Sequence, residues 1–392
     1  MAGVIDTSPL PVPSKAALDE AFKATAKTSQ PSHLTRLLFR VFRFEEAIIL
    51  GLLIIFGVLL LCVSGGPSSE TLWRGFSYNF HGNGTMWMFL QWCSIGTLLL
   101  LVIAAVPMAA GGKGAQLMHG VWQGREGFLG RGKATLLWGM GGLRAYLPFL
   151  ACMGVYEMLK RLIPAVRGAT LYDVEMARFD YWLLGDLSAA IVHKAMHAQW
   201  ITDLLGWLPF GITQLDIHEA CYISYVYAAP ALALSLWFLG RRDHFDRFIG
   251  AITICGALAY IGYVLVPVVG PKYVFPDRWL EATPGALSFM DDIKGRNRDC
   301  FPSLHTAWTT LFLIASWRGL RVLFWVYLPV AIGVYIATFY GGYHYIPDII
   351  AGHALALFAY WVAKPLREWW NRRAGFESAS DPASTSGQSS PR

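Results

Sequence analysis

The sequence predicts an all-α polytopic membrane protein with about eight transmembrane helices. The chain has 392 residues, of which 55% are apolar and 15% are charged, whereas soluble domains are roughly 45–50% apolar and about 25% charged. Its 32 basic and 26 acidic residues are too few to cover the surface of a soluble protein of this length. Several apolar stretches approach the roughly 20 residues that a helix needs to cross a bilayer. These observations exclude a soluble enzyme, a disordered chain and a disulfide-bonded scaffold.

The apolar stretches divide the chain into four regions. The predicted spans are 46–64, 86–110, 143–163, 217–239, 247–269, 303–317, 322–341 and 347–364. Shorter amphipathic pieces within 166–214 are typical of interfacial or re-entrant helices. We therefore expect a mostly disordered cytoplasmic tail, N-terminal transmembrane helices, a C-terminal membrane domain and a disordered cytoplasmic tail, at 1–44, 45–164, 165–365 and 366–392.

The basic residues predict the orientation of these spans. Lys and Arg gather in cytoplasmic loops of membrane proteins. With a cytoplasmic N-terminus and eight spans, twenty of the 32 basic residues fall on the cytoplasmic side. The same topology places the loops 270–302 and 342–347 together on the non-cytoplasmic face. The scattered cations show no dense basic run, so we expect membrane lipids rather than nucleic acid as partners.

The second of these loops carries His344, and Asp348 follows four residues later. At helical spacing the two side chains share one face. A carboxylate that accepts the proton of one imidazole nitrogen leaves the other nitrogen as a nucleophile or base. Pro347 favours the first turn of a helix, which would leave His344 just outside that helix.

The first loop ends in Cys300-Phe301-Pro302-Ser303-Leu304-His305, at another predicted helix start. Backbone N–H groups and the helix dipole favour an anion there. A single boundary histidine is more often structural, and a basic cluster often faces lipid head groups. Because both loops share a face, however, the combined set predicts a phosphate site with Lys272, Arg296 and Arg298 upstream.

These two motifs resemble the type 2 phosphatidic acid phosphatase (PAP2) superfamily, most closely its inositol phosphorylceramide synthase and sphingomyelin synthase branch. The resemblance covers roughly residues 180–365 and implies a six-helix membrane core, which makes the domain at 165–365 the catalytic one. It implies that His344 attacks phosphorus, Asp348 orients His344, and His305 protonates the leaving oxygen. It further implies a reaction without metal or cofactor, with phosphate held by residues drawn from Ser303, Lys272, Arg296 and Arg298.

The chain departs from the phosphatase pattern in its cations. Lys272 is followed by Arg278-Trp279, where the family has Arg-Pro one residue later, and Leu304 replaces a glycine. Ala337-Thr338 stands where the family has Ser-Arg. Bidentate arginines are the usual clamp for a dianion. Their absence favours a singly charged phosphodiester, and therefore head-group transfer between lipids.

Three other functions stay open from the sequence. A lipid phosphatase acting on phosphatidic acid or polyprenyl phosphates shares the first half of the mechanism, and a lipid transporter or scramblase would use the histidines as a gate. A non-catalytic scaffold is the third. Other ionisable residues near the spans could line an acceptor site or form interfacial ion pairs: Glu157, Asp216, His218 and Glu219.

Overall fold

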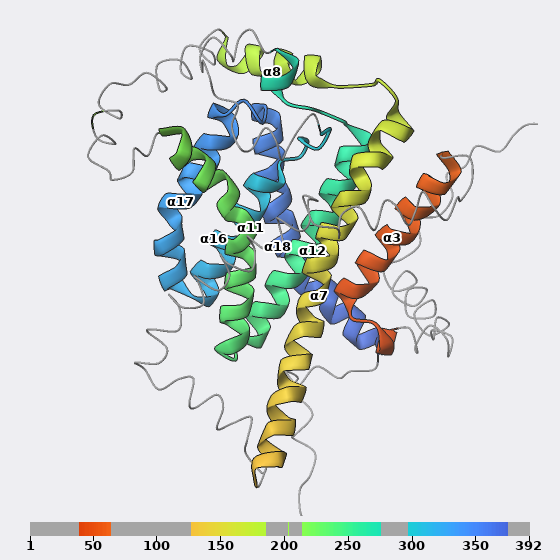
Figure 1. The fold of residues 1–392 in the computed structure, drawn as a ribbon, viewed down its shortest axis with the longest axis vertical. Coiled ribbons are helices and arrows are strands. Elements are labelled where there is room, and N and C mark those ends of the chain that lie inside the picture. Colours follow the sequence, from red (N-terminus) through yellow and green to blue (C-terminus); the bar gives the residue numbers. More distant parts are fainter. Residues whose placement is uncertain (1–38, 64–126, 186–202, 204–213, 276–296, 375–392) are drawn as a thin grey trace, which may run out of the picture. The chain divides into compact units, whose positions relative to one another are not determined.

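The computed structural model describes residues 39–63, 127–185, 203, 214–275 and 297–374. Within these ranges every regular element is a helix, which confirms the all-α fold (Figure 1). In chain order the helices are α3 (Phe44–Val63), α7 (Gly127–Arg167), α8 (Asp173–Leu184), α11 (Gln214–Phe238), α12 (Arg242–Leu265), α13 (Pro271–Val274), α16 (Leu304–Gly319), α17 (Arg321–Tyr340) and α18 (Ile346–Ala374).

Five of the described helices are long and apolar enough to cross a membrane. These segments are Gly132–Tyr156 of α7, Ala220–Phe238 of α11, Arg242–Leu265, Arg321–Tyr340 and Ile346–Ala374. They correspond to five of the predicted spans. Two more predicted spans, 46–64 and 303–317, are the helices α3 and α16. The predicted span 86–110 lies outside the described residues, so the number of eight spans stays a prediction.

Large apolar side chains are exposed along these helices, as a bilayer requires. Trp361 on α18 is 78% exposed and Val322 on α17 is 63% exposed. Such contiguous apolar surface is unfavourable in water but matches lipid tails, so the chain is an integral membrane protein.

Helix α7 is longer than the predicted span at 143–163, because it continues back through a glycine-rich stretch to Gly127. The glycines have a packing role that apolar periodicity does not reveal. A Cβ atom at Gly142 would lie 2.6 Å from Nε1 of Trp237 on α11. Glycine therefore permits the close approach of these two helices.

The described residues belong to two units, 44–367 and 1–43 with 368–392. In the second unit, Nε of Arg40 donates to the carbonyl of Ala374 at 2.9 Å, and Nε1 of Trp370 donates to the carbonyl of Phe42 at 3.0 Å. The prediction that the C-terminal tail is disordered from residue 366 is therefore wrong for the part that ends at Ala374. No glycine interrupts this stretch, and it finds partners in the N-terminal segment.

The core of unit 44–367 is built around α12 and α16. Helix α12 packs against α3, α7, α11 and α16, and α16 also packs against α11 and α17. Helix α18 approaches the start of α16 closely, since a Cβ atom at Gly352 would lie 2.5 Å from the carbonyl oxygen of Ser303. This approach places the first turn of α18 beside the first turn of α16.

Candidate active site

The chain turns sharply between α17 and α18, and this turn carries His344. Gly342 has a φ of 66°, a conformation that favours glycine. The N–H of His344 donates to the carbonyl of Thr338 at 3.1 Å, and the carbonyl of Gly342 accepts the N–H of Lys272 at 2.9 Å. These bonds fold the turn back over the end of α17 and tie it to α13.

His344 lies between Asp348 and His305. Its Nδ1 is 3.4 Å from Oδ2 of Asp348, and its Nε2 is 3.2 Å from Nδ1 of His305. His344 and Asp348 are both buried. The carboxylate beside Nδ1 favours the tautomer with the proton on Nδ1, which leaves a lone pair on Nε2 directed at His305.

Asp348 is fixed by the start of α18. The helix begins at Ile346, so His344 lies just before it, as the position of Pro347 predicted. Oδ2 of Asp348 accepts the N–H of Tyr345 at 3.0 Å. The backbone carbonyl of Asp348 accepts the N–H of Ser303 at 3.0 Å. The second bond joins the two motifs directly.

His305 occupies the first turn of α16 between two tyrosines of α11. The ring of Tyr222 stacks on it with centroids 4.0 Å apart and an interplanar angle of 22°, and the ring of Tyr225 lies 4.4 Å away. The hydroxyl of Tyr222 is 3.4 Å from Nδ1 of His305. Sequence reasoning missed both tyrosines. Their nearest signal was the polar start of α11, which was considered only for its ionisable residues.

The structure describes three of the four predicted phosphate ligands, and each has different partners. Lys272 lies beside the turn, with Nζ 5.4 Å from the ring centroid of Tyr343. Ser303 caps α16, and its Oγ accepts bonds from both the N–H and the hydroxyl of Thr306. Arg298 instead donates to the carbonyl of Gly168. Arg296 lies outside the described residues.

At the position where the family has an arginine, this chain instead forms an apolar contact and an internal hydrogen bond. Ala337 and Thr338 are both buried, and Oγ1 of Thr338 donates to the carbonyl of Tyr335 at 2.8 Å. Among the described residues, Lys272 is the predicted cation that lies next to the His344 turn.

Of the other ionisable candidates, the structure describes the side chain of His218. The side chains of Glu157, Asp216 and Glu219 lie outside the described residues. His218 is described, and its ring lies 4.6 Å from the ring of Tyr340 at the end of α17.

A metal-ligand geometry also exists at the site. Cys300, His344 and Asp348 each bring one donor atom within 4.8 Å of the others. The thiol of Cys300 already donates to the carbonyl of Tyr343 at 3.3 Å, however, and a metal needs the thiolate. These residues therefore fit a metal poorly, and a reaction without metal stays our prediction. This prediction requires that activity persist in an excess of chelator.

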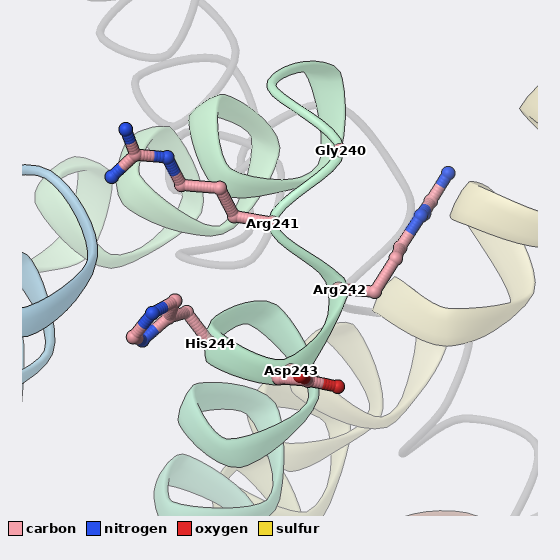
Figure 2. A pocket seen from close by; sticks show the side chains of 5 residues that line it. All are labelled: Gly240, Arg241, Arg242, Asp243 and His244. Atoms are coloured by element: carbon pink, nitrogen blue, oxygen red, sulfur yellow. The ribbon is translucent and has the colours of Figure 1, made fainter. Parts of the chain in front are cut away.

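A cavity of about 290 Å³ lies at the turn between α11 and α12, lined by Gly240, Arg241, Arg242, Asp243 and His244 (Figure 2). Arg241 and Arg242 point in opposite directions in this view, and Arg242 covers the ring of Trp237. The 24 residues of α12 separate this turn from the segment that meets the His344 loop. The cavity is therefore distinct from the histidine site.

Comparison with known proteins agrees with this geometry. Residues 175–362 match the family model of the PAP2 superfamily. The catalytic subunit aur1 of inositol phosphorylceramide synthase from Schizosaccharomyces pombe is 25% identical over 207 residues, which are 47% of this chain and 45% of that protein. The chain thus spans less than half the length of this curated relative. No solved structure matches the chain. The matching segment 175–362 carries His305, His344 and Asp348, so this part of the chain is similar to the PAP2 superfamily and to an inositol phosphorylceramide synthase.

Proposed function

We propose that this protein is a membrane enzyme that transfers a phospho-head group from one lipid to another through a phosphohistidine at His344. The observation that carries the proposal is the position of His344, with Asp348 at Nδ1 and His305 at Nε2. A nucleophile oriented by a carboxylate and faced by a proton donor is the arrangement that covalent phosphoryl transfer needs.

In the first half of the reaction, Nε2 of His344 attacks the phosphorus of a donor phospholipid. The N–P bond forms as the bond from phosphorus to the lipid alcohol breaks, and protonated His305 gives its proton to the leaving oxygen. Asp348 stabilises the positive charge that develops on the ring of His344. Since Nδ1 of His305 now lies 3.2 Å from the attacking nitrogen, we expect His305 to move aside as phosphorus enters.

In the second half, His305 acts as a base. It takes the proton of an acceptor alcohol, whose oxygen attacks phosphorus as the N–P bond breaks. His344 returns to its neutral form, and a new phosphodiester lipid leaves. Water in place of the alcohol would make the same intermediate end in hydrolysis.

The charge around the site favours a phosphodiester donor. A monoester carries nearly two negative charges at neutral pH, and arginine forks usually neutralise them. Here Thr338 replaces an arginine, Arg298 binds the carbonyl of Gly168, and Lys272 lies beside the turn. A singly charged phosphodiester needs less neutralisation than a monoester.

The similar synthase suggests the identity of the two lipids. Its name describes the formation of inositol phosphorylceramide. By analogy, the donor here is an inositol phospholipid and the acceptor is the hydroxyl group of a ceramide. The predicted topology places this reaction on the non-cytoplasmic face of the membrane.

A lipid phosphatase is the second candidate, because the matching superfamily includes phosphatidic acid phosphatases. It would use the same three residues for the first step. The difference lies in whether an alcohol or water reaches the phosphorylated His344.

The test is product analysis with purified protein in lipid vesicles. The vesicles contain phosphatidic acid, phosphatidylinositol or both, with and without ceramide or diacylglycerol, and every phosphorus-containing product is resolved. We expect a new phosphodiester lipid that requires the acceptor and is absent with His344→Ala. Release of inorganic phosphate without need of an acceptor would establish the phosphatase and refute the charge argument.

A further inference from the structure

Helix α8 holds the His344 turn through a buried carboxylate. Asp173, at the start of α8, is 2% exposed. It accepts the N–H of Gly270 at 2.9 Å and the N–H of Val269 at 3.1 Å. It also accepts the hydroxyl of Tyr345 at 3.1 Å. One side chain thus joins the segment after α12 to the residue that follows His344.

A second aspartate of α8 binds the start of α18. Asp180 lies seven residues after Asp173, which is two helical turns, so both carboxylates share one face. Oδ1 of Asp180 accepts the N–H of Ile346 at 2.9 Å. Burial raises the pKa of Asp180 to about 6, while the bond from Ile346 opposes this rise, so the group is largely ionised at neutral pH.

Tyr345 completes the link as a donor. Burial and the nearby Asp173 raise the pKa of the Tyr345 phenol well above its usual value. The phenol therefore keeps its proton and donates it to Asp173. Together the two aspartates bind both residues that separate His344 from Pro347.

The outer face of α8 carries exposed apolar and aromatic side chains around two exposed charged residues, Glu175 and Arg178. Trp182 is 75% exposed and Tyr181 is 62% exposed. Val174, Phe179 and Leu183 are exposed as well. Aromatic residues of this kind are enriched at the boundary between membrane and water.

The contacts of α8 place it at that boundary. Its 12 residues are far too short to cross a bilayer. The N–H of Tyr172, just before α8, donates to the carbonyl of Pro267, two residues beyond the membrane-spanning α12. Asp180 binds Ile346, the first residue of the membrane-spanning α18. A helix tied to the ends of two spans lies where those spans leave the bilayer (Figure 1).

We propose that α8 is an interfacial clamp, whose outer face docks in the head-group layer of the protein's own membrane while Asp173 and Asp180 position the His344 turn. The catalytic consequence of this clamp rests on the proposed function. Docking of α8 holds Tyr345 and Ile346 in place, and so fixes the ring of His344 against Asp348. When the membrane surface accommodates α8 poorly, the ring of His344 is held less firmly against Asp348.

Amide hydrogen exchange of the full protein in lipid nanodiscs tests the docking. The variant carries Tyr181→Ala and Trp182→Ala together. The matched control is Trp361→Ala, because Trp361 is 78% exposed on α18, thirteen residues beyond Asp348. We expect exchange to rise about tenfold within residues 173–184 and 344–349 in the variant and in neither segment of the control.

The two parts of the proposal fail separately. Unchanged exchange within residues 173–184 would show that the outer face is not docked. Faster exchange there with unchanged exchange within residues 344–349 would show that α8 does not hold the turn. Because exchange needs no turnover, the clamp survives even if the wild-type protein catalyses no phosphotransfer.

Kinetics test the positioning role of the inner face. We expect Asp173→Asn to lower kcat about tenfold with KM for the donor lipid unchanged, since the site is displaced rather than removed. Tyr345→Phe should lower kcat about threefold. Because this variant keeps both N–H bonds of Asp173, it guards against a folding defect as the cause. Asp243→Asn, at the cavity between α11 and α12, is the matched control and should change neither. An unchanged kcat in both Asp173→Asn and Tyr345→Phe would overturn the role.

Discussion

His344 and His353 lie nine residues apart at the start of α18, and both reach across to α16, but their partners differ in kind. His344 has a carboxylate at one nitrogen and a second histidine at the other. Nδ1 of His353 lies 2.9 Å from the hydroxyl of Thr310, and its ring lies 4.9 Å from the ring of Tyr335. The turn before α18 and the helix itself therefore present two histidines to the same neighbour in two chemical settings.

The difference in partners separates the proposed nucleophile, His344, from a structural crosslink at His353. The hydroxyl of Thr310 donates to the carbonyl of Thr306 at 2.7 Å, so it accepts from His353 and from the Tyr335 hydroxyl, which lies 2.9 Å away. This network makes Nδ1 of His353 a donor and joins α16, α17 and α18. It supplies no carboxylate for the positive charge that a phosphorylated imidazole develops. Asp348 provides that charge only beside His344.

The strongest way to break this comparison is to remove each histidine in turn. We expect His344→Ala to reduce turnover by at least about 1,000-fold, because the proposed covalent intermediate forms on His344. His353→Gln, which retains a donor, should keep activity within about threefold. Donor lipid labelled on phosphorus should leave acid-labile label on the wild type and on His353→Gln. Label that persists on His344→Ala would contradict the assignment of the nucleophile.

The Asp348→Asn variant tests whether the carboxylate distinguishes His344 from His353. The amide keeps the size of the side chain but not its charge, so the favoured tautomer of His344 and its developing charge lose their partner. We expect turnover to fall by about two to four orders of magnitude, in line with losses seen when a carboxylate is removed from a catalytic histidine. The measurement is single-turnover formation of phosphohistidine. A rate within threefold of wild type would remove the orienting role.

His305→Ala tests the acid on the other side of His344. With an ordinary lipid alcohol as leaving group, we expect a loss of about 10²- to 10⁴-fold, which is typical of general acid catalysis. A donor that releases p-nitrophenol needs no proton, and its first step should be nearly normal. Equal losses with both donors would mean that His305 has another role. Tyr222→Phe, which keeps the ring stacked on His305, is the control for packing.

The sequence could predict that His344, Asp348 and His305 lie together, because each belongs to a short motif at a predicted helix start. His344 and Asp348 are four residues apart, and His305 follows a recognisable helix start. The partners that complete the site come from distant helices. Tyr222 stacks on His305 across 83 residues, and no short-range pattern records such a contact.

Charge alone did not predict which side chains bind one another. Arg298 precedes the His305 motif and was a natural phosphate ligand, but it binds the carbonyl of Gly168 at the end of α7. Asp173 and Asp180 lay in a segment that was predicted to form interfacial or re-entrant helices. Their importance depends on three-dimensional contacts with Gly270, Tyr345 and Ile346, which the sequence spacing does not contain.

The smallest expected effect concerns His353 itself. His353→Leu removes a donor but leaves the acceptor Thr310 with its bond from Tyr335. Hydrogen bonds between membrane helices are worth about 0.6 kcal/mol on average, because the unfolded chain in the membrane also finds partners. We therefore expect a loss of about 1 kcal/mol in unfolding free energy, measured by denaturant titration in detergent, with turnover within about threefold. A loss of turnover that exceeds the loss of folded protein would place His353 in the reaction and remove the contrast with His344.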